Sequence, residues 1–409
     1  MMRRLLILTF TALLMLTAVA QKTAVSGTVV SGADGGAVAG ATVTADGAGD
    51  EGLAVVTNSD GFFTLKADSM PRTITVSFLG YRSQRVDLSR HSSPLTIRLQ
   101  PTSIRLNEVV IMAEDPRQLV SDAIGKIGRN YSAVPELYHC FYRETAMKRQ
   151  HYICVAEGVV DMYKTPYSRS VTRDRVAIRK GRRLLSPKRS DTLSVKVLGG
   201  PVGPVLLDVV KNRDFLLNEA DLDCYDMKME TPQSIADRQQ YVVSLTPRRV
   251  MPWALYYGRL YIDVETRAFT RADLTLDMSS RERATQMMLV RKPAGVRFRP
   301  KEMSLLVDYR YEDGVTRISY IRSTFRFNCD WRRRLLATAF TATCEMVVTS
   351  RTSSNVAPIR GRESFDARDA FFDKVEYFRD TTFWRDYNII EPTETLDRAI
   401  GRIMRKYNR

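Results

Sequence analysis

The sequence predicts a mainly β protein built from two parts. Short stretches in which apolar and polar residues alternate recur along the chain, and glycine, asparagine and proline separate them. The formal net charge of +16 belongs almost entirely to the second part, because the first part is nearly neutral. All five cysteines also lie in the second part. We therefore expect a small β-sandwich followed by a larger antiparallel β domain with a few flanking helices.

The first 20 residues have the composition of a cleavable export signal. Met1–Arg4 is basic, Leu5–Leu16 is apolar, and Ala18–Ala20 provides small residues for cleavage. The apolar run is shorter than the roughly 20 residues that cross a membrane as a helix. We therefore expect an exported protein with a signal peptide at 1–20, a sandwich at 21–112 and a β-rich domain at 113–409.

Alternation and turn chemistry locate the strands of the first part. Ile74–Phe78 and Leu95–Leu99 place an apolar residue at every second position, as a strand with one buried face requires. Asn58–Gly61 has the composition of a turn, because Asp60 can bind its own backbone and Gly61 tolerates a positive φ. Several such strands at a spacing of roughly 8–12 residues predict a sandwich.

Five phrases of this region follow the order found in one family. They are Ser26–Val29, Val38–Val43, Ser59–Phe63, Val76–Tyr81 and Leu106–Val110. In this order they resemble the carboxypeptidase regulatory-like domain. The resemblance implies a transthyretin-like β-sandwich and a place in the envelope of a Gram-negative bacterium, either periplasmic or associated with the outer membrane. It does not imply peptidase activity, because this module is usually an accessory domain.

The same domain often precedes a plug and a large barrel in outer-membrane nutrient receptors. Here the remainder of the chain is too short for that arrangement, and no plug-like sequence is present. Leu106–Ile111 resembles the start of the junction to such a plug. We expect it to be a last strand running into a linker, with an energy-coupling segment as the alternative.

The second part begins and ends with a predicted helix. Asp115 and Pro116 suit a helix start, and apolar residues then recur at helical spacing until Asn130. Glu394–Tyr407 has acidic residues first and basic residues last, which matches the helix dipole. Between them, Tyr138–Met147 and Tyr152–Tyr163 predict a hairpin. Further strands are expected at Tyr241–Leu245, Tyr257–Val264, Ala268–Asp277, Met303–Tyr311, Thr316–Phe327 and Leu336–Val348.

Two resemblances suggest what this β domain is. Tyr241–Pro247 and Tyr257–Thr266 resemble the strands of lipoprotein-carrier-like half-barrels, which wrap a curved sheet around an apolar cavity. Gly199–Pro201, Gly258–Asp263 and Trp384–Asn388 resemble exported proteins of unassigned function that carry the same N-terminal domain. A small outer-membrane barrel is an alternative, although arginines interrupt the apolar face of Thr316–Phe327.

Basic residues are densest between Arg169 and Arg189. On a strand, Arg173, Arg175 and Arg179 share one face, and a guanidinium binds carboxylate or phosphate well. The candidate anion-binding residues are Arg173, Arg175, Arg179, Arg182 and Arg183. The expected partner is an anionic envelope component or a membrane protein, with a lipid as a further option. Nucleic acid is not expected, because the protein is exported and carries no nucleic-acid-binding motif.

No motif in the sequence indicates catalysis, a metal or a cofactor. His139 and His151 are each near a cysteine, but the offsets place the paired side chains on opposite faces of a strand. Asp263 and Glu265 share a strand face, so an acid pair of a hydrolase remains an alternative. The sequence therefore favours a non-enzymatic envelope protein that binds an apolar or anionic ligand or a partner protein, with a hydrolase of envelope polysaccharide as the alternative.

Overall fold

The computed structural model describes residues 22–46, 51–90, 93–102, 114–188, 191, 195–197, 199–331, 337–377 and 383–407. The predicted signal peptide, the junction Leu106–Ile111 and the boundary at residue 112 lie outside these residues. Within them, no helix combines the length and the apolar character that crossing a membrane requires.

The N-terminal sandwich consists of two sheets around one apolar core. The strands are β1 (Thr23–Ser31), β2 (Thr42–Asp46), β3 (Ala54–Val56), β4 (Phe62–Ala67), β5 (Thr73–Ser77), β6 (Gln84–Asp87) and β7 (Leu95–Leu99). One sheet has the order β4-β1-β7 and the other β3-β2-β5-β6. Ile74, Val76 and Ile97 point into the core between the sheets, as the alternation predicts.

The predicted turn at Asn58–Gly61 is present, but a different side chain stabilises it. Oδ1 of Asn58 accepts hydrogen bonds from the backbone N–H groups of Asp60 and Phe62, both at 2.9 Å. Gly61 has a φ of 75°, and a Cβ there would lie 2.5 Å from the carbonyl oxygen of Val29. This position therefore requires glycine for both conformation and space.

The second part is built on one open antiparallel sheet of 11 strands, with β20 alone joined in parallel. The order is β12-β13-β14-β15-β17-β18-β19-β8-β9-β10-β20, so β12 and β20 form the edges. The bounds are β12 (Tyr225–Ile235), β13 (Arg238–Pro247), β14 (Tyr256–Asp263), β15 (Phe269–Leu276), β17 (Val296–Glu312), β18 (Val315–Trp331), β19 (Thr338–Thr352), β8 (Glu136–Lys148), β9 (His151–Lys164), β10 (Arg175–Leu185) and β20 (Glu376–Tyr377). The predicted mainly β fold with an antiparallel second part is confirmed.

The β8–β9 hairpin and all the later predicted strands are present, although the start of Leu336–Val348 lies outside the described residues. β12 was not predicted. It is an edge strand that contains Pro232, and its sequence is mostly polar. A strand of this kind buries little, so hydrophobic periodicity does not reveal it.

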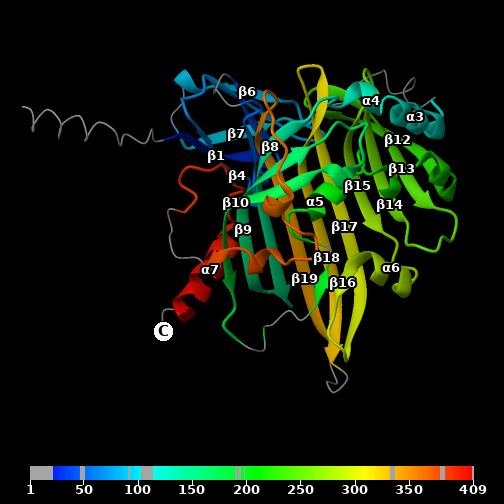
Figure 1. The fold of residues 1–409 in the computed structure, drawn as a ribbon. Helices are drawn as coiled ribbons and strands as arrows, with labels where there is room; N and C mark the ends of the chain where they lie inside the picture. Colours follow the sequence, from blue (N-terminus) through cyan, green and yellow to red (C-terminus); the bar gives the residue numbers. More distant parts are fainter. Residues whose placement is uncertain are drawn as a thin grey trace, which may run out of the picture.

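The two faces of the large sheet have different neighbours (Figure 1). On one face, here called the inner face, the side chains of the sheet form the main core. The helices α3 (Pro116–Gly125), α5 (Gly203–Leu206) and α6 (Arg281–Met288) pack into the same core. The outer face contacts the sandwich, the segment 383–393 and α7 (Glu394–Tyr407). Both faces are therefore apolar, and the strands read as long hydrophobic runs where they are covered on both sides.

The predicted helices are confirmed at both ends of this domain. The side chain of Asp115 accepts a hydrogen bond from the N–H of Gln118 and caps α3, and the short helix α4 (Ile127–Asn130) follows. α7 packs Leu396, Ile400 and Ile403 against the outer face. The helix α6 was not predicted, because its eight residues are too few to show a clear period.

A buried ionic cluster attaches the C-terminal segment to the outer face. Glu157 on β9 binds Arg143 at 2.7 Å and Arg182 at 3.1 Å, and it accepts a hydrogen bond from Nε1 of Trp384 at 3.0 Å. Burial acts to raise the pKa of Glu157, but the two arginines outweigh it and hold the pKa below its ordinary value. The carboxylate therefore stays charged and anchors residue 384 on β9.

A second buried cluster attaches residues 203–224, here called the crossing segment, to the inner face. Nζ of Lys164, at the end of β9, lies 2.6 Å from Oδ2 of Asp208, and Nζ of Lys211 lies 2.6 Å from Oδ1 of Asp174. Tyr309 on β17 donates a hydrogen bond to Asp208 at 2.7 Å. Burial opposes the charge of Lys164, but Asp208 and Asp174 more than offset it, so its pKa is raised. Burial and the neighbouring Lys164 lower the pKa of Lys211 to about 8.

Removing one carboxylate of this cluster should destabilise the protein strongly. Asp208→Ala leaves Lys164 buried without its closest partner, and breaking such a pair costs about 3–5 kcal/mol. Urea unfolding monitored by circular dichroism measures the loss. Asp214→Ala, an exposed carboxylate in the same segment, is the control and should change the stability by less than about 0.5 kcal/mol. Equal effects of the two substitutions would contradict the assignment.

Candidate functional site

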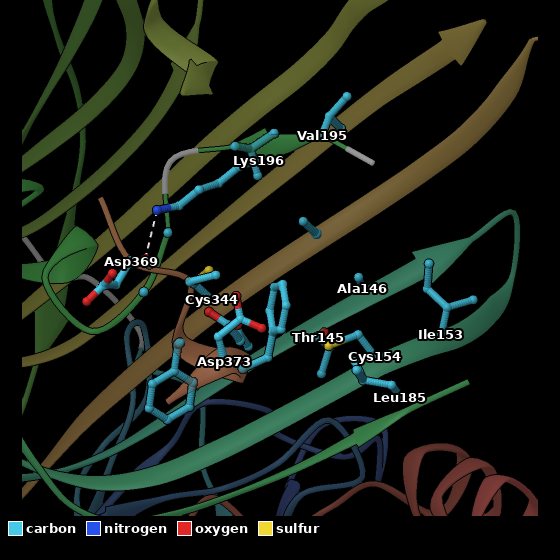
Figure 2. Close-up of a pocket in the computed structure, with 18 of the residues that line it drawn as sticks. Thr145, Ala146, Ile153, Cys154, Leu185, Val195, Lys196, Cys344, Asp369 and Asp373 are labelled. Atoms are coloured by element: carbon cyan, nitrogen blue, oxygen red, sulfur yellow. Dashed lines mark hydrogen bonds between the residues drawn. The ribbon is translucent and has the colours of Figure 1, made fainter. Parts of the chain in front are cut away.

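A cavity of about 270 Å³ lies on the inner face of the sheet. Its floor is formed by β8, β9 and β19, and its walls by residues 195–197, 199–200 and 369–373 (Figure 2). Most lining side chains are apolar, including Ile153, Val195 and Phe371. A hollow of this kind inside a covered sheet is a candidate binding site for a small apolar group.

The hollow exists because small side chains meet at one place on the sheet. Ala146 on β8 lies directly opposite Ala342 on β19, and the next inward-facing pair is Glu144 and Cys344. On the other side of β8, Ala146 is opposite Cys154. Elsewhere the same face carries large residues such as Tyr142 and Phe340. Because interiors are otherwise closely packed, three adjacent strands with small residues leave unfilled volume.

Glu144 is an ionisable residue on the floor of this cavity. Its Oε2 accepts a hydrogen bond from the Tyr142 hydroxyl at 2.9 Å. Burial raises the pKa of Glu144 from its ordinary value of 4.5 to about 7, although Tyr142 and the backbone amides of Gly200 and Phe372 act in the opposite direction. Near neutral pH the side chain therefore exchanges between a charged acceptor and a neutral donor.

One wall is a segment that crosses the cavity at residues 367–373, here called the covering segment. Nζ of Lys196 donates to the carbonyl oxygens of Ala367, Arg368 and Asp369 at 3.1, 2.8 and 2.7 Å, and Figure 2 shows the last of these bonds. At the other end, Arg183 binds the carbonyl oxygen of Phe372 and lies 3.6 Å from Asp373. The covering segment is thus fixed at both ends by basic side chains.

The ring of Phe371 closes the middle of this wall. It is buried and meets Tyr142 edge to face, with 5.1 Å between ring centroids. A Cβ at Gly158 would lie 2.7 Å from Cζ of Phe371, so glycine on β9 makes the space for the ring. The covering segment is therefore held against the sheet by the close packing of Phe371 as well as by hydrogen bonds.

The thiols at the cavity are weak acids. Burial raises the pKa of Cys154 and of Cys344 well above the ordinary value, and the nearby Glu144 acts in the same direction. Both thiols stay protonated near neutral pH and present small, weakly polar surfaces to the cavity. All five cysteines are free, and four of them are buried.

The structure separates the candidate anion-binding arginines. Arg173 and Arg175 are exposed, Arg173 in a 3₁₀ turn that precedes β10 and Arg175 at its first position. A bulge between Ile178 and Lys180 changes which residues face outwards. Arg179 binds Asp161 at 2.5 Å, Arg182 binds Glu157, and Arg183 points to the opposite face. The five residues therefore do not form one face, and anion binding by any of them stays a prediction.

The other candidate groups have structural partners. Asp263 and Glu265 both bind Arg238, at 2.7 and 2.9 Å. Burial acts to raise the pKa of Asp263, but Arg238 and the backbone hydrogen bonds of the turn hold it below its ordinary value. His139 binds Asp161 at 2.9 Å and points away from Cys140, as expected from the strand geometry. In the described part of the chain, no three His, Cys, Asp or Glu side chains are grouped so as to hold a metal ion.

Comparison with family models agrees with the sandwich described above. Residues 25–111 match the model of the CarboxypepD_reg-like domain. The five phrases quoted from the sequence all lie in this range. No curated protein matches the chain.

Solved structures show only remote similarity. A DUF1329 family protein from Desulfovibrio piger has 11% sequence identity and a TM-score of 0.26, and the match covers 60% of this chain and 95% of that one. A LolA superfamily protein from Nitrosomonas europaea has 11% identity and a TM-score of 0.21 over 60% and 96% of the two chains. MucB has 14% identity and a TM-score of 0.19 over 57% and 97%. These TM-scores are too low to bear on function.

Polar contacts at several places hold the CarboxypepD_reg-like domain on the second domain, and two of these places lie on the outer face. Arg351 on β19 binds Glu51 at 2.7 Å, and their backbones also form a bridge. Nζ of Lys66 donates to the carbonyl oxygens of Trp384 and Tyr387 at 2.7 and 2.9 Å. Val56 adds an apolar contact to this interface. The CarboxypepD_reg-like domain thus covers the side of the sheet opposite to the cavity.

Sequence reasoning did not find the cavity. Glu144, Ala146, Cys154, Ala342 and Cys344 come from three segments, and none belongs to a motif. Only the register of β8 with β9 and β19 brings them together. The one local signal is the appearance of alanine and cysteine at inward positions of strands that otherwise carry large residues.

The titration of Glu144 should be visible in the stability of the protein. The folded state holds the proton of Glu144 more tightly than the unfolded chain does. The stabilisation of the fold by this proton is therefore fully present below pH 4.5 and is lost as the pH rises through about 7. The free energy of unfolding of the wild type should fall by about 3 kcal/mol relative to Glu144→Gln over this window. Urea unfolding at several pH values measures it, and parallel pH profiles for the two proteins would contradict it.

Proposed function

We propose that this protein is a non-enzymatic binding protein of the cell envelope whose cavity holds an apolar group of a small ligand. The observation that carries the proposal is the cavity of about 270 Å³ on the inner face, with mainly apolar walls. Apolar cavities of about 150 Å³ hold benzene in other proteins. The volume here therefore suits an apolar group of roughly ten carbon atoms, by proportion.

The chemistry of the lining supports an apolar occupant. The two thiols are protonated, and Glu144 on the floor is partly neutral at pH 7. The lining also includes three aspartates, each paired with a basic side chain: Asp191 with Lys148, Asp369 with Lys374 and Asp373 with Arg183. The charge of Lys196 is directed to backbone oxygens of the covering segment. An apolar group that enters this space therefore meets protonated thiols, a partly neutral carboxyl group and aspartates that are already paired.

The location in the envelope is supported by the predicted export signal and by the CarboxypepD_reg-like domain. In this proposal the sandwich is a spacer or an interaction module. It contacts the outer face through Arg351 and Lys66, so it leaves the inner face and its cavity to the ligand.

Filling the floor of the cavity should abolish binding. Ala342→Phe places a ring in the space opposite Ala146. We expect the affinity for an apolar fluorescent probe with ten ring carbons, such as 1-aminonaphthalene, to fall by about tenfold or more, the equivalent of about 1.4 kcal/mol. Fluorescence titration measures the dissociation constant. Thr343→Phe, on the same strand but on the other face, is the control and should bind normally.

Folding must be checked by circular dichroism, because a ring in the core can strain the sheet. Ala146→Leu provides a milder substitution from the opposite strand and should weaken binding in the same direction. If both variants are folded and bind the probe as the wild type does, the cavity is not the binding site.

A hydrolase is the second candidate, because a buried carboxyl group with a pKa of about 7 suits general acid–base catalysis. If this candidate is right, the wild type releases reducing ends from envelope polysaccharide and Glu144→Gln slows the release by about 10²-fold or more. The binding function predicts no release by either protein and retained probe binding by Glu144→Gln. A reducing-end assay beside the fluorescence titration separates the two.

A further inference from the structure

A second hollow, of about 400 Å³, lies at the end of the sheet where β8 turns into β9. We call it the basic cleft. Five of its lining residues are basic or histidine, and they come from the turn, from the loop after β10 and from α7: Lys148, Arg149, His151, Lys188 and Arg402. Among the described residues that line it, Asp191 is the single acidic one.

The acidic residue of the basic cleft is already neutralised. Asp191 accepts a hydrogen bond from Oγ of Ser186 at 2.6 Å and lies 3.4 Å from Nζ of Lys148. Burial acts to raise its pKa, but Ser186 and Lys148 outweigh it and hold the pKa below the ordinary value. Arg149, Lys188 and Arg402 form no ion pair with a carboxylate in the described parts of the chain. The basic cleft therefore carries excess positive charge.

The basic cleft and the cavity are adjacent. Ile153, Ser186 and Asp191 line both of them, so they share a wall. An apolar space thus lies beside a positively charged and more polar one. A ligand that occupies both must have an apolar part and, within a few ångströms of it, an anionic part.

We infer that the ligand is an anionic amphiphile, with its chain in the cavity and its carboxylate or phosphate head in the basic cleft. This inference rests on the proposed function, because it assumes that the cavity holds an apolar group. The arginines Arg149 and Arg402 suit an oxygen-rich head, since a guanidinium offers a planar set of donors. Both are exposed, so the head group remains partly in water and the contribution of each cation is modest.

The test compares ligands that share a chain and differ in the head. Isothermal titration calorimetry with decanol, decyl phosphate and decyltrimethylammonium measures three dissociation constants for the full-length protein. We expect decyl phosphate to bind about tenfold more tightly than decanol, and the cation to bind more weakly than decanol. Raising the salt concentration should reduce the preference for phosphate and leave decanol unchanged.

Neutral variants then locate the head group. The triple variant Arg149→Gln, Lys188→Gln and Arg402→Gln should lose the preference for decyl phosphate and keep the affinity for decanol. The matched control is the triple variant Lys126→Gln, Arg129→Gln and Arg169→Gln, which removes three exposed positive charges near the opposite end of β9. It should keep the preference for decyl phosphate. The inference would be overturned if the control variant lost the preference for decyl phosphate, or if the cleft variant kept it.

Two further outcomes separate this inference from the proposed function. If decanol binds and Ala342→Phe abolishes its binding, but the phosphate head gives no advantage, the proposed function stands and the inference fails. If inorganic phosphate alone binds as tightly as decyl phosphate, and Ala342→Phe leaves both unchanged, the cleft binds a free anion and the inference fails. The proposed function fails as well if decanol does not bind. Loss of decyl phosphate binding in Ala342→Phe supports the amphiphile.

Discussion

The buried pairing of Lys164 with Asp208 is the interaction on which the second domain depends. An open sheet with an apolar inner face must be covered, and the cover here includes a crossing segment with little regular structure of its own. Such a segment needs specific attachment, because it cannot pair along an edge. Two lysines and two aspartates inside the core provide it, since any shift of the segment would leave a buried charge without its partner.

On both faces of the large sheet, ion pairs and hydrogen bonds of basic side chains hold irregular segments in place. On the outer face, Glu157 binds two arginines and Trp384, and so holds the C-terminal segment between the sheet and the sandwich. On the inner face, Lys196 and Arg183 hold the covering segment by its carbonyl oxygens. Some of the basic side chains of this domain, among them Arg143, Lys164 and Lys211, are buried and attach irregular segments to the strands.

The cavity results from side-chain size in an otherwise packed core. Ala146 and Ala342 face each other across β8 and β19, and Phe371 closes the space from the other side. A carboxyl group in this position is costly when charged, which is why the pKa of Glu144 rises. The same burial keeps the thiols protonated. The site is thus suited to hold an apolar group, and Glu144 on its floor responds to pH near neutrality.

The sequence alone determined the two-part organisation, the sandwich and most strands, because these depend on local alternation, turn residues and a recognisable order of phrases, as at Ile74–Ser77 and Asn58–Gly61. It also placed the helices that begin at Asp115 and at Glu394. Only the tertiary structure decided the site. Glu144, Cys154 and Ala342 meet through strand register, and the arginines of β10 are separated by a bulge that no local pattern indicates. Register and bulges depend on contacts between distant segments, which a pattern along one chain does not contain.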